Sequence, residues 1–384
     1  MAILKIRDWQ TGRNIGGLPR HDKLFRPVSQ RALLATSIRI VCVIAQLRHH
    51  WFLVALAALF ALGFFAHGPL QPLADQAWLR TCIVALAMFL MGLSLEAGAI
   101  WNALRRPWAT LLAVGVTFGL LPLIAWAISP LLTREFAGGL LVAAVTPCTM
   151  ASATVWTRKA GGNDSAATVV TVVTNLVCFL VTPAWMYLLT GAGSQQSLGE
   201  FGGMVVHLLL SVVLPVIVAQ ALRMHSLVAA WSAQRKAWLS LGSQYCILLM
   251  VTIGAIHTGE KLSGASGSAG ATNAMLELLA MIAAVFFVHV SSFWLGFGLA
   301  RVCGLPWGDQ VAVAFAGSQK TLMVGMKVSI DSHFSVLPMV TYHIGQLFID
   351  TVLADWLQRR KPIPIPAGDE RRVRQDSGDG RSDR

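Results

Sequence analysis

The residues with the clearest capacity for chemistry lie in the segment Phe315–Gly325, which interrupts a long apolar stretch. Lys320 stands at its centre, preceded by Ser318 and Gln319, followed by Thr321, and flanked by two glycines that we expect to loosen the helix. A charge inside a bilayer is costly unless it faces a protein interior, so a functional role is the first expectation. Lys320 could bind a solute carboxylate or sulfonate, take the place of a coupling cation, or carry a proton. A lysine that snorkels to the membrane surface is the alternative.

A matching interruption lies in the first half of the chain, where a proline and several hydroxyl groups break another apolar stretch. Pro147 lacks a backbone N–H and therefore frees a carbonyl; freed carbonyls and hydroxyls suit a cation, whereas N–H groups at a helix start suit an anion. The alternative is a proline-kinked helix whose hydroxyls bond to their own backbone. Its other polar members are Thr146, Cys148, Thr149, Ser152 and Thr154. We expect the two interruptions to form one site.

Two further apolar stretches add polar residues that are expected to face this site. The first contributes Thr171 and Asn175, and the second contributes Gln346 and Asp350. Asp350 follows Gln346 by four residues, which places both on one helix face. Asp350 could pair with Lys320 or carry a proton, and a structural hydrogen bond to a hydroxyl or amide is an equally weighted alternative.

The composition indicates a polytopic membrane protein. The chain has 384 residues, of which 55% are hydrophobic and 12% charged, and its mean hydropathy is +0.63. The net charge is +12, and most of the Lys and Arg residues lie in the two tails and in short loops. This distribution indicates a cytoplasmic membrane face in contact with lipid and argues against nucleic-acid binding. The six cysteines are scattered without a CxxC pair, so neither disulfides nor structural zinc is expected. His207 and His289 are expected to be hydrogen-bonded core residues.

Apolar runs of about twenty residues predict ten membrane-spanning helices, each broken helix counted once. The spans are expected at about 50–66, 78–97, 108–128, 137–160, 165–189, 203–222, 237–257, 275–300, 310–330 and 335–357. The expected organisation is a basic N-terminal tail (1–49), a first half (50–190), a second half (203–357) and a disordered basic C-terminal tail (358–384). The Gly- and Ser-rich stretches Gly191–Gly203 and Gly259–Thr272 are expected to be flexible connections.

The distribution of Lys and Arg predicts the orientation. Nine lie before Trp51 and eight after Trp356, whereas the loops expected on the opposite side hold only Arg134, Lys261 and Lys327. Because basic residues favour the cytoplasmic side, both termini are expected to be cytoplasmic, with the protein in a bacterial-type inner membrane.

The second half of the chain can be aligned with the first by a constant shift of 171 positions. Asn175 then falls on Gln346, and Pro147 falls on Ser318. Five spans per half is an odd number, so equivalent helices would run in opposite directions. Inverted repeats with matching helix breaks are typical of secondary transporters, whose sites lie where the breaks meet near the bilayer midplane.

At these residues the chain resembles the bile acid:sodium symporter superfamily, in particular its SBF-like branch. The likeness covers about 50–357 and rests on the two interruptions together with flanking residues, namely Pro147-Cys148-Thr149, Ser152, Thr157, Ala160, Gly162-Asn163, Gly317 to Leu322, and Gly325. The resemblance implies an all-helical fold with a core domain from spans 3–5 and 8–10 and a panel domain from spans 1, 2, 6 and 7. It also implies two broken helices that cross in the core, and alternating access between the two domains.

The chain departs from sodium-coupled members of that superfamily at the first cation site. Phe315 stands where those members have a glutamate, Ala153-Thr154 replaces a Ser-Asn pair, and Ala167 replaces one of two hydroxyls, leaving Thr171. These departures argue against Na⁺ binding at that site and leave the fold assignment unaffected. Lys320 replaces a neutral residue, and its charge could take over the role of a bound cation.

The sequence therefore predicts a secondary active transporter that moves a small organic solute, anionic and amphipathic, coupled to Na⁺ or H⁺. No cofactor is expected, and Na⁺ enters only as a candidate coupling ion; the oligomeric state is left open. A cation/proton exchanger that uses Lys320 and Asp350 is the alternative. An intramembrane enzyme is a remote alternative, because the chain contains neither HExxH nor GxSxG. A membrane sensor would be expected to carry a folded output domain, which the short C-terminal tail does not provide.

Overall fold

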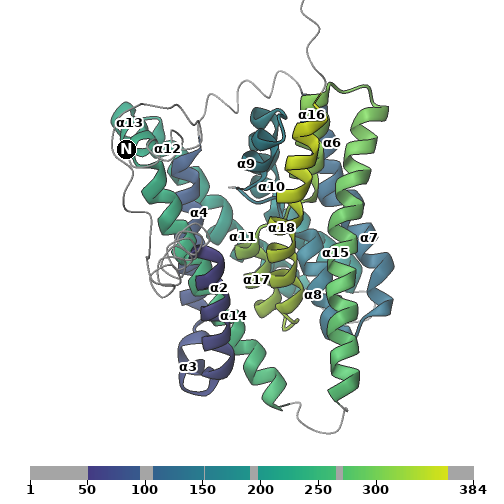
Figure 1. Ribbon diagram of the computed structural model, residues 1–384. Helices are drawn as coiled ribbons and strands as arrows, with labels where there is room; N and C mark the ends of the chain where they lie inside the picture. Colours follow the sequence, from purple (N-terminus) through teal and green to yellow (C-terminus); the bar gives the residue numbers. More distant parts are fainter. Residues whose placement is uncertain (1–50, 96–106, 151, 191–197, 265–270, 362–384) are drawn as a thin grey trace, which may run out of the picture. The chain divides into compact units, whose positions relative to one another are not determined.

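The apolar runs of the sequence form helices, and the regular structure within the described residues is helical throughout (Figure 1). The computed structural model describes residues 51–95, 107–150, 152–190, 198–264 and 271–361. The predicted N-terminal tail and most of the C-terminal tail lie outside these ranges. The chain divides into two compact units, Met1–Val54 and Ala55–Arg384, and packing is described within the second. Of the first unit, residues 51–54 are described, and they form the first turn of α2.

The first half of the chain forms ten helical segments among its described residues. They are α2 (Trp51–Phe65), α3 (His67–Ala74), α4 (Ala77–Ser94), α6 (Pro107–Gly115), the π-helical η2 (Val116–Leu120), α7 (Leu121–Ile128), the 3₁₀ turn η3 (Ser129–Leu131), α8 (Arg134–Val145), α9 (Ser152–Lys159) and α10 (Asp164–Thr190).

The second half begins with an interrupted helix and ends with a long one. Its segments are α11 (Leu198–Leu208), the π-helical η4 (Leu209–Val213), α12 (Leu214–Arg223), α13 (Ser226–Gln234), α14 (Lys236–Gly264), α15 (Ala271–Val302), α16 (Trp307–Ser318), α17 (Leu322–Asp331) and α18 (Leu337–Arg359).

Six of the described helical stretches are long and apolar enough to cross a bilayer, which agrees with an integral membrane protein. The pair α2 and α3, bent by 100°, would make a seventh. The interrupted helices α8, α9, α16 and α17 have 12, 8, 12 and 10 residues. At 1.5 Å per residue none reaches the ~30 Å of a hydrocarbon core alone. Ten spans in two inverted repeats therefore remain a prediction, although helices lie near all ten predicted positions.

Several predicted connections are shorter than expected or contain helices. The helices α3 and α13 fall in predicted loops, α11 begins inside the stretch 191–203, and α14 continues through Gly259 to Gly264. A Cβ on Gly259 would stand 2.4 Å from the carbonyl oxygen of Phe64, so this glycine permits close helix packing instead of forming a linker. Lys327, counted among the loop residues, lies inside α17, and Arg134 is the first residue of α8.

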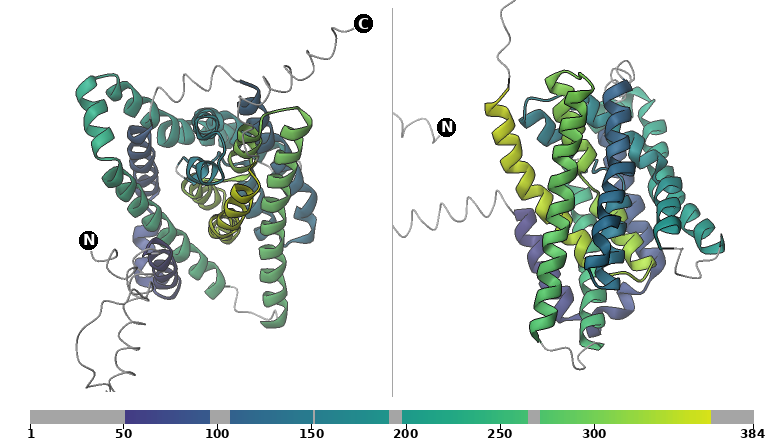
Figure 2. Two further views of the ribbon diagram at one scale, coloured as in Figure 1. Left: turned by 45° about the horizontal axis from the view of Figure 1, so that its top comes forward. Right: turned by 90° about the vertical axis from the view of Figure 1, so that its right-hand side faces the viewer.

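Two groups of helices are visible in the packing. In one, α4 packs against α12 and α14, and α14 packs against α3. In the other, α16 packs against α15, α6, α9 and α10, and α18 packs against α15 and α8 (Figure 2). Contacts between α14 and α17, α4 and α17, and α10 and α11 join the groups. The division into panel and core domains stays a prediction.

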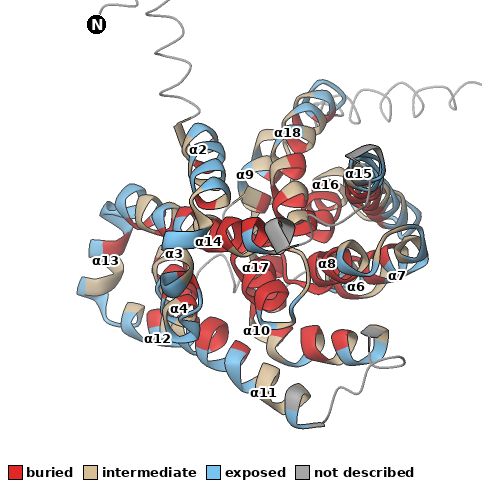
Figure 3. Cartoon of the chain, turned by 90° about the horizontal axis from the view of Figure 1, so that it is seen from below, coloured by how far each residue is buried: buried red, intermediate tan, exposed pale blue. Residues whose placement is uncertain are grey.

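Three of the four interrupted helices, α8, α16 and α17, are buried over most of their length. Nine residues of α16, nine of α17 and eight of α8 are buried. Seen from below, buried residues concentrate on these helices, whereas α12 and α13 carry many exposed positions (Figure 3). The helix breaks therefore lie in the protein interior, where unpaired backbone groups need partners from other helices.

Candidate functional site

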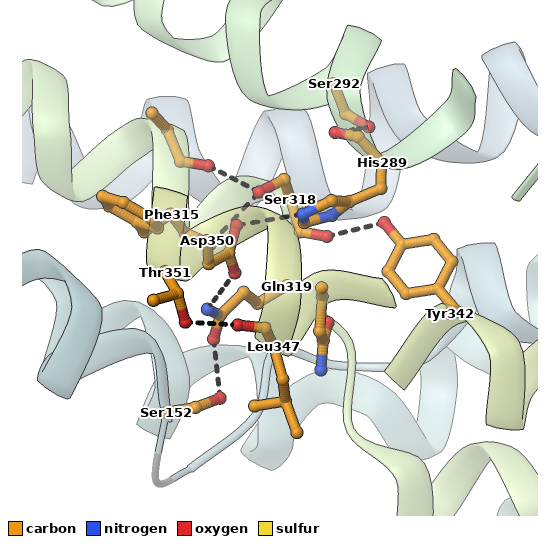
Figure 4. Close-up of polar contacts among 12 residues, drawn as sticks. Ser152, His289, Ser292, Phe315, Ser318, Gln319, Tyr342, Leu347, Asp350 and Thr351 are labelled. Carbon is orange, nitrogen blue, oxygen red and sulfur yellow. Dashed lines mark hydrogen bonds and ion pairs between the residues drawn. The ribbon is translucent and has the colours of Figure 1, made fainter. Parts of the chain in front are cut away.

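The two interruptions contact each other directly. The amide of Thr321 donates a hydrogen bond to the carbonyl of Pro147 at 3.0 Å. The hydroxyl of Ser152 donates to Oε1 of Gln319 at 2.8 Å (Figure 4). Stretches that lie far apart in the sequence thus come together as one cluster, as the sequence analysis expected, and their role in binding stays a prediction.

Lys320 is fully buried between these stretches. Its ammonium donates to the carbonyls of Thr146 and Thr117, each at 2.8 Å, and lies 5.7 Å from the ring centroid of Phe118. Thr146 caps the C-terminal end of α8, where the helix dipole places partial negative charge. Within the described part of the chain Lys320 has no ion-pair partner. Backbone oxygens, not a carboxylate, stabilise this cation, and a lysine that snorkels to the surface is excluded.

A π-helical segment and a proline create one of the two carbonyl ligands. The amide that follows η2 bonds the carbonyl five residues earlier, and the next residue, Pro122, has no N–H. The carbonyls of Thr117 and Phe118 are therefore left without a helical donor. Lys320 binds the first, and the indole N–H of Trp185 binds the second at 2.6 Å. The sequence analysis missed Thr117; a proline five residues after a threonine inside a span was the available signal.

Two amide side chains hold the interrupted backbones in place. Asn175 on α10 donates to the carbonyls of Cys148 and Thr171, each at 2.8 Å. Gln346 on α18 accepts from the amide of Lys320 at 2.9 Å and donates to its carbonyl at 3.0 Å. Oδ1 of Asn175 is buried and has no donor among the described residues. Each amide therefore clamps one helix break, and Asn175 keeps one free acceptor.

Asp350 does not pair with Lys320, so that expectation was wrong. One carboxylate oxygen lies 3.0 Å from Nε2 of His289, and the other accepts from the amide of Gln319 at 2.5 Å (Figure 4). Asp350 and His289 are both buried, and the contact between them gives each polar side chain a partner. Asp350 does form a hydrogen bond to an amide, as the structural alternative expected, and its role in binding or in proton transfer stays a prediction.

A tyrosine missed by the sequence analysis closes the end of α16. The hydroxyl of Tyr342 donates to the carbonyl of Ser318 at 2.7 Å, and its ring meets His289 edge-on at a centroid distance of 5.4 Å. His289 is thus a hydrogen-bonded core residue, as expected. His207, by contrast, is exposed, so its assignment to the core was wrong.

Three of the seven predicted hydroxyls bond to their own helix; for the first interruption this was the alternative kept open, and Thr146 is the one hydroxyl there for which the structure shows such a bond. Thr146 donates to Ala143, Thr171 to Ala167, and Ser318 to Ala314, at 2.8, 2.6 and 2.8 Å. Thr154 is half-buried and bonds Thr168 at 3.2 Å, while Thr149 and Thr321 are buried at the breaks.

The two glycines near Lys320 serve packing and do not form the break. Gly317 lies in α16 and Gly325 in α17, whereas the break itself is formed by Gln319, Lys320 and Thr321. A Cβ on Gly325 would stand 2.3 Å from the sulfur of Met339. Whether these glycines also loosen the helix stays a prediction.

Comparison with known proteins gives the family. The model of the SBF-like CPA transporter family matches residues 50–359. The chain belongs to this family. It is 29% identical over 322 residues to an uncharacterized protein of Pseudomonas aeruginosa, covering 81% of this chain and 93% of the relative.

Animal relatives of this SBF-like transporter extend the comparison. Sodium/bile acid cotransporter 7 of Xenopus tropicalis is 24% identical over 348 residues, which cover 84% of this chain and 97% of that protein. Its counterpart in Danio rerio is also 24% identical over 348 residues, covering 84% and 99%. The predicted membrane transporter of the bile acid:sodium symporter type is confirmed, and the family is one of transporters, not of intramembrane enzymes.

The SBF-like transporter also contains two cavities outside the crossed helix breaks. One, of about 1160 Å³, lies between α4, α8, α11 and α17, and the other, of about 640 Å³, lies between α4, α14 and the turn after α17. Lys320 lines neither of them. The expected role of Lys320 in solute binding therefore stays a prediction.

Proposed function

We propose that this protein is a secondary active transporter that moves a small, amphipathic organic anion across the cell membrane by alternating access. It has ten spans in two inverted repeats that form panel and core domains, both termini are cytoplasmic, and transport is coupled to Na⁺ or H⁺. The names of the animal relatives, which combine sodium with bile acid, support an amphipathic anion as solute. The paired helix breaks in mutual contact support the location of the coupling site.

One observation carries the proposal: the ammonium of Lys320 is held by two backbone carbonyls where the breaks meet. Backbone carbonyls are the ligands with which membrane proteins bind monovalent cations, so the ammonium acts as a tethered cation. Phe315 supports this reading, because it is fully buried and packs edge-on against Phe293 at a centroid distance of 4.9 Å. An apolar ring thus occupies the position of the carboxylate that serves cations in the sodium-coupled members of the superfamily.

The cation/proton exchanger has less support. It requires Lys320 and Asp350 to act together, yet Asp350 is bound by His289 and Gln319 and makes no ion pair with the lysine. Coupling through a remaining oxygen site stays open, since Oδ1 of Asn175 is a buried acceptor without a donor in the described chain.

The test is uptake by purified protein in sealed vesicles. Cholate uptake is measured under an inward Na⁺ gradient, an inward H⁺ gradient, and neither, for the wild type and for Lys320→Gln and Lys320→Ala. Lys159→Gln is the control, because this lysine is partly exposed and pairs with Asp355 at 2.7 Å, away from the helix breaks. We expect both Lys320 variants to lose uptake or to acquire a different ion dependence, while the control keeps both.

Elution as a single species on gel filtration shows that a variant is folded. Folded Lys320 variants with wild-type uptake and wild-type ion dependence would refute the tethered-cation role. Absence of gradient-driven uptake by the wild type, for cholate and for a panel of other carboxylates and sulfonates, would refute the proposed function.

A further inference from the structure

The larger cavity combines apolar walls with a group of charges. Trp78, Leu208 and Phe334 line it alongside Lys327 and Asp331. Its volume of about 1160 Å³ is slightly above the roughly 300–1,000 Å³ usual for small-molecule sites. Such a lining suits a solute with a bulky apolar body and one charged group.

The charged residues that line this cavity are the cations Arg134 and Lys327 and the anions Glu135 and Asp331. Asp331 forms an ion pair with Lys327 at 2.6 Å and a second one with Arg80, which lines the smaller cavity, at 3.2 Å, so two cations share one carboxylate. The side chains of Lys327 and Arg80 are 3% and 10% exposed, whereas that of Asp331 is 31% exposed. Arg80 also donates to the carbonyl of Ala74 at 2.8 Å, and its Nε has no partner among the described residues. Buried cations require an anion, and the carboxylate that now serves them has the easiest path to water.

We propose that Lys327 and Arg80 form the subsite for the anionic group of the transported solute, and that Asp331 occupies this subsite as an internal substitute. The inference rests on the proposed function and names a recognition site for its solute. A carboxylate or sulfonate that enters the cavity takes the place of the Asp331 carboxylate, which turns to water. A neutral solute of the same shape cannot make this exchange.

The exchange also links solute binding to movement. Arg80 lies on α4, while Lys327 and Asp331 lie one turn apart on α17. Their ion pair joins the two packing groups at the wall of the cavity. When a solute anion replaces Asp331, the direct ion pair between α4 and α17 is exchanged for a bridge through the solute, so the contact between the two groups then depends on bound solute.

A natural cysteine provides the assay. Cys82 on α4 is exposed and lines the cavity, whereas Cys148, Cys178 and Cys246 are buried. In a background carrying Cys42→Ser and Cys303→Ser, labelling of purified protein with a charged maleimide therefore reports on Cys82. Cholate, at concentrations below its micelle threshold, is expected to slow the labelling, and its uncharged methyl ester is expected to protect at least tenfold less effectively.

Variants of the three charged residues are expected to shift the cholate concentration for half protection in opposite directions. Lys327→Gln and Arg80→Gln should raise the cholate concentration for half protection by about tenfold or more, because each removes a charged hydrogen bond to the anion. Asp331→Asn should lower that concentration, because the internal competitor is gone. Arg158→Gln is the matched control, since this arginine forms an ion pair at 2.7 Å with 71% of its side chain exposed; it should behave as wild type.

The outcomes separate the possible failures. If Asp331→Asn weakens cholate protection as much as Lys327→Gln does, the three residues form a structural cluster and the inference is wrong. If Lys320 variants lose uptake while Lys327 and Arg80 variants keep wild-type protection, this inference fails and the proposed function stands. If Cys82 is protected without cholate in nanodiscs of phosphatidylglycerol and not of phosphatidylcholine, the subsite binds a lipid headgroup, which overturns the assignment to a solute.

Discussion

Replacement of Gln346 by leucine tests the clamp on the second helix break. Gln346 is fully buried, and its side chain serves both backbone groups of Lys320, accepting from the amide at 2.9 Å and donating to the carbonyl at 3.0 Å. Leucine fills a similar volume but leaves both groups without a partner. Each unsatisfied buried group costs about 1–3 kcal/mol, so Gln346→Leu should lower the free energy of unfolding by about 2–6 kcal/mol.

The equivalent change in the first half is expected to cost less. Asn175→Leu removes the donor to the carbonyl of Cys148, a single orphaned group at the break, and so should cost about 1–3 kcal/mol. Gln358→Leu on the same helix as Gln346 is the control, because Gln358 is exposed and should be near neutral. The measurement is the thermal unfolding midpoint of purified protein, together with uptake.

The order of the thermal unfolding midpoints of the three variants tests whether Gln346 holds the second helix break. We expect Gln346→Leu to have the lowest midpoint, Asn175→Leu an intermediate one, and Gln358→Leu that of the wild type. Uptake should fall with Gln346→Leu, because the clamp positions the backbone that carries Lys320. A Gln346→Leu protein that melts with the control and transports normally would show that the break is held by other contacts.

Two further predictions concern the surroundings of the break. Tyr342→Phe removes only the hydrogen bond to the carbonyl of Ser318, so it should lower the free energy of unfolding by about 1 kcal/mol, measured as a small drop in the thermal midpoint; an unchanged midpoint would contradict this cap. Gly325→Val introduces a branched side chain whose Cβ would lie 2.3 Å from the sulfur of Met339, so overpacking should cost about 1–3 kcal/mol; a midpoint equal to wild type would mean that Met339 moves aside freely.

The sequence was informative wherever a local chemical signal coincided with an apolar run. Pro147 and Lys320 marked both helix breaks, and the positions of the long helices followed from hydrophobic length. The shift of 171 positions paired Asn175 with Gln346, and both amides prove to bind the backbone of a break. Family membership explains why these local signals led to the right class of protein.

What the sequence could not provide are pairings between distant helices. His289 is 61 positions from Asp350, and nothing in the local pattern distinguishes this partner from Lys320. The carbonyl of Thr117 is likewise 203 positions from Lys320, and backbone acceptors carry no side-chain signature at all. Helix α13 was missed because an apolar segment between basic residues resembles a loop when length is the criterion.

The arrangement of positive charge along α17 connects the two proposed sites. Lys320 precedes the N-terminal end of this helix, where the dipole is also positive, and Lys327 lies seven residues further on. Seven residues correspond to about 10 Å along a helix. At that separation, with an effective dielectric constant of about 20, an anion bound at Lys327 would be attracted to the Lys320 ammonium by about 1.7 kcal/mol. Lys320 is held by neutral carbonyls and makes no ion pair within the described part of the chain, so no directly bound carboxylate neutralises its charge. A tethered cation at the crossed breaks would thus favour an anion in the cavity and disfavour a second cation, so the loss of the carboxylate at Phe315 and the gain of Lys320 act in the same direction.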